Sequence, residues 1–202
     1  MKAGCAKSTN PQVQMQGFTM LEVLVAVFIL SLGMLGIAAL QVTSKRTNFE
    51  AVQRTSATFL TQDLLERIRS NPAQMTTYTN AGAGRTMTLS GADGITSVDC
   101  ASAACTTPAL AMYDLYEFSQ ALSGVAERAN GNLTGGLVSP TVCITGPAAR
   151  PGYVNVAIAW RGMTKLSDPG SNACGATSGF YDAPSGGTNV YRRVLFVNTY
   201  VN

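Results

Sequence analysis

The 202-residue chain contains no histidine. Ser/His/Asp and Cys/His catalysis need an imidazole as the central base, and many zinc sites need one as a ligand. Charged residues are also scarce, at 12% of the chain, compared with about 25% in typical soluble proteins. The absence of histidine excludes these two kinds of catalysis in their usual forms, and the low charge indicates a secreted protein or one with a membrane segment.

Excess positive charge is also small. The formal net charge is +3, but Lys2 and Lys7 lie in an N-terminal segment that we expect to be removed. Without them the 14 Lys and Arg become 12, against 11 Asp and Glu. No long basic stripe remains, so electrostatics predicts no binding to nucleic acid.

The N-terminal region combines a polar leader with a long apolar run. Residues 1–16 contain two lysines and no acidic residue, and they lack the apolar core of a secretory signal peptide. The run from Val23 to Val42 is long enough for a transmembrane helix, which needs about 20 apolar residues. Gly33 and Gly36 lie within it, as is common where membrane helices approach one another closely. The positive leader favours a cytoplasmic N-terminus, whereas Lys45 and Arg46 just past the other end of the run favour the opposite orientation.

Glu22 lies at the start of this apolar segment. A carboxylate within a membrane is unfavourable unless it finds a partner, and such residues mark functional sites by default. A plain signal anchor explains neither this glutamate nor the Gly17-Phe18 pair before it. A partner for Glu22 is therefore needed.

The ten residues from Gly17 to Ala26 read GFTMLEVLVA and resemble the processing site of type IV prepilins with a class III leader. In that family a membrane peptidase cuts after the glycine, and the new N-terminal residue is methylated. The resemblance implies cleavage by prepilin peptidase between Gly17 and Phe18 and N-methylation of Phe18. It also gives Glu22 a role in subunit docking, with the N-terminal amine of a neighbouring subunit as its partner. Such a pair is tolerable where each buried charge alone is not.

The close resemblance covers about residues 17–71. Residues 31–41 and 57–71 are similar to the PilV family of pilus modification proteins, and a looser likeness continues through paired cysteines and a Trp-Arg-Gly segment. Gln16 departs from the basic residue that often precedes the glycine. Ala39 lies near the place where major pilins often carry a helix-kinking proline, which fits a minor subunit.

Three regions are expected: a cleaved prepilin leader at 1–17, a long helix at 18–71 and a periplasmic globular head with an antiparallel sheet at 72–202. Within the helix, residues 18–44 are assigned to the membrane and residues 45–71 are amphipathic. Its predicted apolar face has steps of three and four residues and consists of Phe49, Val52, Ser56, Phe59, Leu60, Leu64 and Ile68. Asn71-Pro72 ends it.

Asp63 and Glu66 are interpreted as solvated helix charges near Arg67 and Arg69, and not as a catalytic pair. In the head, Thr107 is predicted to cap a short helix that ends near Gly124. Its apolar stripe consists of Ala111, Leu115, Phe118 and Leu122.

Strands are predicted at residues 85–90, 137–145, 153–160 and 190–201, in a sheet of three or four strands. The last has apolar residues on both faces, which predicts a more central position. The predicted fold class is α+β: a pilin fold, in which a long N-terminal transmembrane and spine helix packs against a small antiparallel sheet head.

Four cysteines remain if Cys5 leaves with the leader: Cys100, Cys105, Cys143 and Cys174. They allow three pairings, and we favour Cys100–Cys105 with Cys143–Cys174. A periplasmic head predicts disulfides. A four-cysteine zinc site and free thiols are the alternatives, although zinc sites usually show two closely spaced pairs.

The resemblance implies a structural subunit and not an enzyme, with no cofactor and no metal. It implies a minor pilin that takes part in type IV pilus assembly and priming, with effects on adhesion and twitching motility. The implied partners are prepilin peptidase, other minor and major pilins, the pilus assembly platform and a tip adhesin. The implied location is the bacterial inner membrane, as a single-pass protein with the head in the periplasm, and then the pilus. A pseudopilin of a type II secretion system shares the N-terminal chemistry and is the alternative. A head that is itself a binding module, as an adhesin or a DNA receptor, is a second alternative, although the near-neutral charge of the mature chain argues against DNA capture as its main role.

Overall fold

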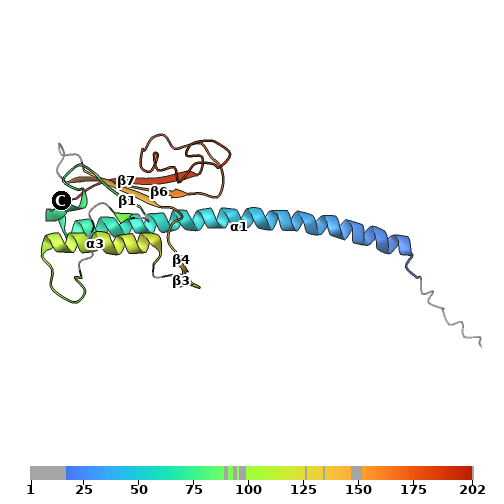
Figure 1. Cartoon of the computed structure of the whole chain (residues 1–202). Helices are drawn as coiled ribbons and strands as arrows, with labels where there is room; N and C mark the ends of the chain where they lie inside the picture. The colour runs from blue at the N-terminus through green and yellow to red at the C-terminus, as the bar shows by residue number, and fades with distance from the viewer. Residues whose placement is uncertain are drawn as a thin grey trace, which may run out of the picture. The chain divides into compact units, whose positions relative to one another are not determined.

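The computed structural model describes residues 17–88, 91, 92, 95, 99–125, 127–133, 135–146 and 152–201. The chain divides into two compact units, one that ends at Ser44 and one that begins at Lys45. Helix α1 (Met20–Ser70) contributes to both (Figure 1).

The first unit consists of the apolar part of α1. Its large apolar side chains are exposed along the whole segment, from Met20 at 90% to Val42 at 52%. The helix is long and apolar enough to cross a membrane, as judged by length and composition. A helix that is apolar on all sides needs lipid or other helices around it.

In the second unit, one face of α1 packs into the head. The buried residues of this face are Gln53, Ala57, Thr61, Leu64, Leu65 and Ile68. The predicted stripe was wrong in its first half, because Val52 and Phe59 are 60% and 66% exposed. The smaller Ala57 and Thr61 are buried in the head instead. A 3₁₀ turn (Pro72–Gln74) and helix α2 (Met75–Tyr78) follow α1.

The head contains one antiparallel sheet in the order β2-β1-β5-β6-β7. Its strands are β1 (Arg85–Thr88), β2 (Gly91–Ala92), β5 (Thr141–Thr145), β6 (Tyr153–Arg161) and β7 (Arg192–Tyr200). A separate small hairpin joins β3 (Arg128–Ala129) and β4 (Asn132–Leu133). The outermost strand, β2, has two residues, so four longer strands make up most of the sheet.

The predicted central position of the last strand is wrong, because β7 lies at an edge of the sheet. Its apolar residues on both faces do not reflect burial on both faces, since Phe196 is 52% exposed. Strand β5 begins directly after Pro140, which has no N–H to donate to a ladder.

The N-cap position of helix α3 (Thr107–Ser123) is Thr106, one residue earlier than predicted, and its side chain makes no capping hydrogen bond. Thr106 has extended backbone angles, whereas Thr107 and Pro108 are already helical. The helix ends as predicted at Gly124, whose φ of 68° is the left-handed conformation common at helix C-termini.

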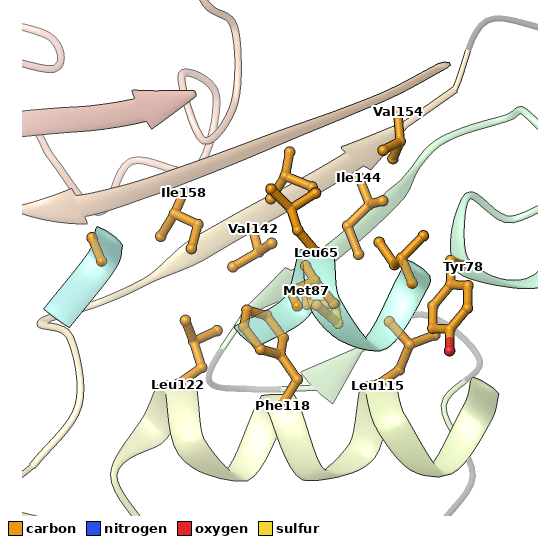
Figure 2. Packing of buried hydrophobic residues seen from close by; sticks show 14 of the residues in the cluster. Leu65, Tyr78, Met87, Leu115, Phe118, Leu122, Val142, Ile144, Val154 and Ile158 are labelled. Atoms are coloured by element: carbon orange, nitrogen blue, oxygen red, sulfur yellow. The ribbon is translucent and has the colours of Figure 1, made fainter. Parts of the chain in front are cut away.

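The core lies between the sheet and the helices α1 and α3. All four residues of the predicted α3 stripe are buried: Ala111, Leu115, Phe118 and Leu122. In Figure 2, Phe118 and Leu122 point from α3 toward Leu65 of α1 and toward Val142 and Ile158 of the sheet. The fold is therefore α+β, with a long apolar N-terminal helix and a small antiparallel head, as the sequence predicted.

Candidate functional site

Phe18 lies two residues before α1, and Glu22 lies in the first turn of this helix. Thr19 precedes the helix, and its Oγ1 and carbonyl oxygen accept the Glu22 N–H at 3.3 and 3.1 Å. The Thr-x-x-Glu spacing is that of a capping box, with the glutamate at the third helical position. Glu22 is thereby held in the first turn, where the helix dipole favours a negative charge.

A shallow hollow lies beside Glu22. Its lining consists of Phe18, Glu22, Val23, Ala26, Val27 and Leu30. Phe18 is 84% exposed, and none of the ion pairs among the described residues includes the Glu22 carboxylate. Glu22 is the one charged side chain of this hollow, so a cation from another molecule finds an acceptor there.

Within the second unit, Glu50 joins α1 to the head. Its Oε1 accepts hydrogen bonds from the backbone N–H of Met163 and Thr164 at 2.8 and 3.0 Å and from the Thr164 hydroxyl at 2.9 Å. Arg193 on β7 donates to both carboxylate oxygens at 3.2 Å. Burial on its own raises the pKa of Glu50, but the hydrogen bonds from Arg193, Thr164 and Met163 outweigh it and lower the pKa.

A second polar cluster surrounds Asp114 of α3. The buried hydroxyl of Tyr78 donates to its Oδ2 at 2.6 Å, and Arg67 of α1 donates to its Oδ1 at 3.3 Å. Arg67 also pairs with Asp63 at 2.9 Å. Burial, and next the Asp114 carboxylate, raise the pKa of Tyr78. These hydrogen bonds connect α2 and α1 to Asp114 of α3.

Glu66 pairs with Arg69 at 2.6 Å, and both side chains are largely exposed. Asp63 pairs with Arg67 in the same helix. Both carboxylates therefore lie as interpreted from the sequence, as helix charges neutralised by arginines one turn away.

The four head cysteines form two disulfides, Cys100–Cys105 and Cys143–Cys174. This is the pairing that we favoured from the sequence. It leaves none of the four as a thiolate for a zinc ion. Cys5 lies outside the described residues.

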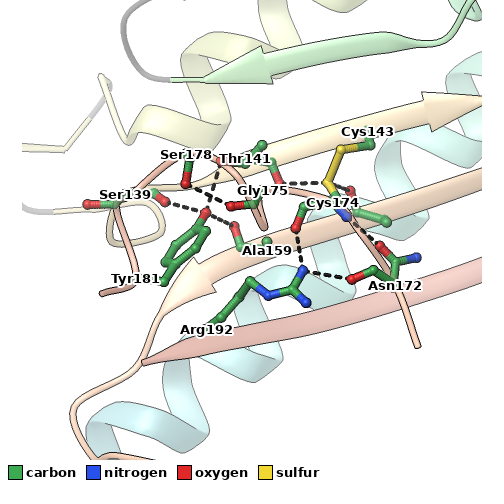
Figure 3. The surroundings of a disulfide bond; sticks show 11 residues. Ser139, Thr141, Cys143, Ala159, Asn172, Cys174, Gly175, Ser178, Tyr181 and Arg192 are labelled. Carbon is green, nitrogen blue, oxygen red and sulfur yellow. Dashed lines mark hydrogen bonds between the residues drawn. A yellow bond between two sulfur atoms is a disulfide. The ribbon is translucent and has the colours of Figure 1, made fainter. Parts of the chain in front are cut away.

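The Cys143–Cys174 disulfide holds the long segment between β6 and β7 on the outer face of the sheet (Figure 3). Arg192, 2% exposed, donates to the carbonyls of Asn172 and Cys174 at 2.7 Å and to Asp168 Oδ1 at 2.7 Å. The Tyr181 hydroxyl, also buried, donates to the Ser139 carbonyl at 3.0 Å or to Thr141 Oγ1 at 2.9 Å.

Sequence reasoning missed Glu50, Arg192 and Arg193 as anchoring residues. The Tyr-Arg-Arg segment could have indicated two of these anchors, because successive side chains along a strand point to opposite faces of the sheet. Arg193 reaches α1, and Arg192 reaches the outer loop.

Two family models match the chain. The model for the prokaryotic N-terminal methylation motif matches residues 14–38, which include Gly17, Phe18 and Glu22. The model for the family described as type IV pilin Tt1218 matches residues 39–116, from the middle of α1 to α3. None of the curated proteins or solved structures matches the chain.

Proposed function

This chain is a type IV pilin, and we propose that it is a minor subunit, similar to PilV pilus modification proteins, that takes part in pilus assembly and priming. Prepilin peptidase cuts between Gly17 and Phe18, and Phe18 becomes the methylated N-terminus. Residues 18–44 then anchor the subunit in the inner membrane, with the head in the periplasm, until it enters the pilus. Effects on adhesion and twitching motility follow from its place among the minor and major pilins.

The observation that carries this proposal is the Glu22 carboxylate in an otherwise apolar, exposed hollow that Phe18 also lines. Removal of residues 1–17 creates a positive amine on Phe18. The amine of one subunit and Glu22 of the next are each unfavourable alone in a membrane, and pairing relieves both. Pairing also fixes the axial register of the incoming subunit.

The unbroken α1 supports the minor class. It runs from Met20 to Ser70 without an internal proline, and Ala39 stands near the position of the kinking proline of major pilins. A type II secretion pseudopilin is the alternative, because the N-terminal segment serves both systems in the same way. The location of the processed chain distinguishes the two.

The test is mass spectrometry of filaments sheared from the native host, with a search for the peptide that begins at Phe18. A methylated Phe18 peptide in the filaments is the expected result. The same peptide confined to the membrane fraction favours the pseudopilin. A chain that keeps residues 1–17 in every fraction overturns the proposal.

Glu22→Gln supplies a sharper test, since it removes the charge and keeps the shape. We expect normal cleavage and at least a tenfold loss of the subunit from filaments, whereas Glu22→Asp retains part of the incorporation. Glu66→Gln is the matched control, because this carboxylate on the same helix is 69% exposed and pairs within its own chain. Equal incorporation of Glu22→Gln and Glu66→Gln contradicts the docking role.

A further inference from the structure

A cleft lies on the outer face of the sheet, the face turned away from α1 and α3. Its volume is about 380 Å³, which is within the range of small-molecule pockets. Two cross-strand rows of outward side chains form its floor: Thr86, Cys143, Ala157 and Phe196 in the first, and Thr145, Asn155 and Asn198 in the second. The single methyl group of Ala157 leaves the floor low at the middle of the first row.

Residues 172–174 form a wall of the cleft, and covalent and polar contacts hold this wall in place. The Cys143–Cys174 disulfide ties it to β5 (Figure 3). The buried Arg192 donates to the carbonyls of Asn172 and Cys174. Asn172 Oδ1 accepts the Cys174 N–H at 2.9 Å, which orients the Asn172 amide. The cleft is therefore preorganised, and a ligand that enters it orders little of the chain.

The amides of Asn155 and Asn198 are free to bind a ligand. These two residues are directly opposite each other on β6 and β7, where Cβ atoms lie about 5 Å apart. Neither amide makes a hydrogen bond to another residue that the structure describes, and the same is true of the Thr86 and Thr145 hydroxyls. Amides and hydroxyls supply both donors and acceptors. The floor thus offers several unused, uncharged hydrogen-bonding groups side by side.

The described part of the cleft has no free charge. Arg85 contributes to the lining, but it is 5% exposed, and its guanidinium donates to the carbonyls of Thr77 and Tyr78 at 2.8 and 3.3 Å. Its charge is thus bound within the head. A phosphate, a nucleic acid or a carboxylate finds no opposite charge here, so the chemistry favours an uncharged ligand.

Phe196 adds an exposed aromatic ring at the β7 end of the first row, where it is 52% exposed. The face of an aromatic ring is negative and attracts the weakly positive C–H groups of a sugar ring stacked on it. Each sugar hydroxyl is both a donor and an acceptor, which matches the amides of Asn155 and Asn198 beside the ring. The combination is the chemistry that recognises a saccharide.

An extended peptide fits this cleft less well. Such a peptide is bound through main-chain hydrogen bonds to the edge of a sheet. The floor of the cleft belongs largely to β5 and β6, which are interior strands with a neighbour on both sides. Their backbone groups are already paired in the ladders, so only side chains are available to a ligand there.

We propose that the cleft over Ala157 binds a neutral saccharide. The ring of Phe196 stacks against the C–H face of one sugar unit, and the amides of Asn155, Asn198 and Asn172 bind its hydroxyl groups. All of these residues lie in the second unit of the chain. The proposal therefore goes beyond the role in the filament and does not depend on Glu22 or on N-terminal processing.

The test uses the full chain in a detergent without a sugar headgroup, such as lauryldimethylamine oxide, because maltoside detergents carry the proposed ligand. The probe is an array of immobilised glycans with neutral, sialylated and sulfated end units. We expect binding to at least one neutral glycan and weaker binding when its end unit is sialylated or sulfated. The free monosaccharide or disaccharide of this end unit should compete, which excludes recognition of the linker.

Variants at the floor of the cleft should weaken this binding. Asn198→Ala should lower the affinity about tenfold, because it removes hydrogen bonds to the sugar. Phe196→Ala should also lower it about tenfold, whereas Phe196→Tyr keeps the ring and should retain most of it. Tyr200→Phe is the matched control, because it removes a hydroxyl from the same face of β7 outside the cleft. This control should leave the affinity unchanged.

NMR of the side-chain amides gives a readout that needs no variant. When the free saccharide is added to the full chain, the amide signals of Asn155 and Asn198 should shift with the same concentration dependence as the competition on the array. The amide of Gln62, which lies in a different groove between α1 and β7, should not shift.

Three results overturn the proposal: no neutral glycan on the array binds, the free saccharide does not compete, or Asn198→Ala and Phe196→Ala bind as tightly as Tyr200→Phe. A chain that binds the saccharide but keeps residues 1–17 in every cell fraction contradicts the proposed function alone. A chain that is processed and enters filaments but binds no saccharide contradicts this proposal alone. The two hypotheses therefore fail separately.

Discussion

Glu50 of α1 and Arg193 of β7 form an ion pair across 143 residues of sequence, with two nitrogens of the guanidinium within 3.2 Å of the carboxylate oxygens. Both side chains are mostly buried, at 24% and 13% exposed. The same carboxylate also holds the start of the segment that follows β6. One glutamate thus fixes the helix, the last strand and the outer loop of the head.

Glu50→Gln should lower the free energy of unfolding of the head by about 1–2 kcal/mol, because hydrogen bonds to a charged acceptor are lost while Arg193 stays buried. Urea unfolding of the full chain in detergent measures this. Glu66→Gln should change it by less than about 0.5 kcal/mol, as for other exposed ion pairs. Equal effects of the two substitutions contradict the anchoring role.

The Glu50 contribution should also depend on pH. Because the hydrogen bonds lower its pKa in the folded state, its stabilisation is complete above the unfolded-state pKa and is lost as the pH falls through the lower folded-state pKa. The stability advantage of the native chain over Glu50→Gln should therefore shrink between about pH 5 and pH 3. If the difference in stability between the native chain and Glu50→Gln stays constant over this range, the lowered pKa of Glu50 is contradicted.

The two disulfides should differ in their effect on stability. They join residues 31 and 5 positions apart. If loop closure in the unfolded chain decides the effect, loss of Cys143–Cys174 should lower the free energy of unfolding by about 3–4 kcal/mol. Loss of Cys100–Cys105 should lower it by about 2 kcal/mol. Double Cys→Ser variants of each pair, unfolded without reductant, test this order. The reverse order shows that native contacts, and not loop closure, decide the effect.

Tyr78→Phe should lower the free energy of unfolding by about 1–2 kcal/mol. Asp114 then keeps its hydrogen bond from Arg67 but loses the one from the Tyr78 hydroxyl. The raised pKa of Tyr78 means that its contribution is present below the unfolded-state pKa near 10 and is lost as the pH rises beyond it. The difference in free energy of unfolding between the native chain and Tyr78→Phe should therefore disappear in alkaline solution. Tyr200→Phe, at an exposed ring, should change stability by less than about 0.5 kcal/mol.

Gly136→Ala should destabilise the head by about 3 kcal/mol. Its φ of 78° is left-handed, and an added Cβ lies 2.6 Å from the Leu122 carbonyl oxygen. Gly131→Ala is the matched control, because its φ is 81° but no atom lies within 4 Å of the new Cβ. The free energy of unfolding of Gly131→Ala should be lower by about 1 kcal/mol. If thermal unfolding shows the two variants to be destabilised by similar amounts, a clash at Gly136 is ruled out.

Local patterns in the sequence predicted the long helix, the α3 stripe and the strand positions. The apolar run, the Asn71-Pro72 end and the alternation of residues 153–160 each depend on neighbours within one element, so one sequence suffices. The cap of α3 shifted from Thr107 to Thr106 because two adjacent threonines fit the same signal.

Relationships between distant residues could not be predicted in this way. The position of β7 at the sheet edge depends on strand order, and apolar residues on both faces do not reveal it. The buried side of α1 was misassigned in its first half, because the small residues Ala57 and Thr61 are buried while Phe59 is exposed. The partners of Glu50 and Arg192 likewise lie far away in sequence and are brought close by the sheet.

Strand β7 lies at one edge of the sheet, so one of its two sides has no neighbouring strand among the described residues. Residues 194–200 are seven uncharged residues without proline, a composition that favours strand stacking where an edge is exposed. A soluble version of the head should therefore be prone to aggregation through this strand, and any contact that covers β7 should also keep the head in solution.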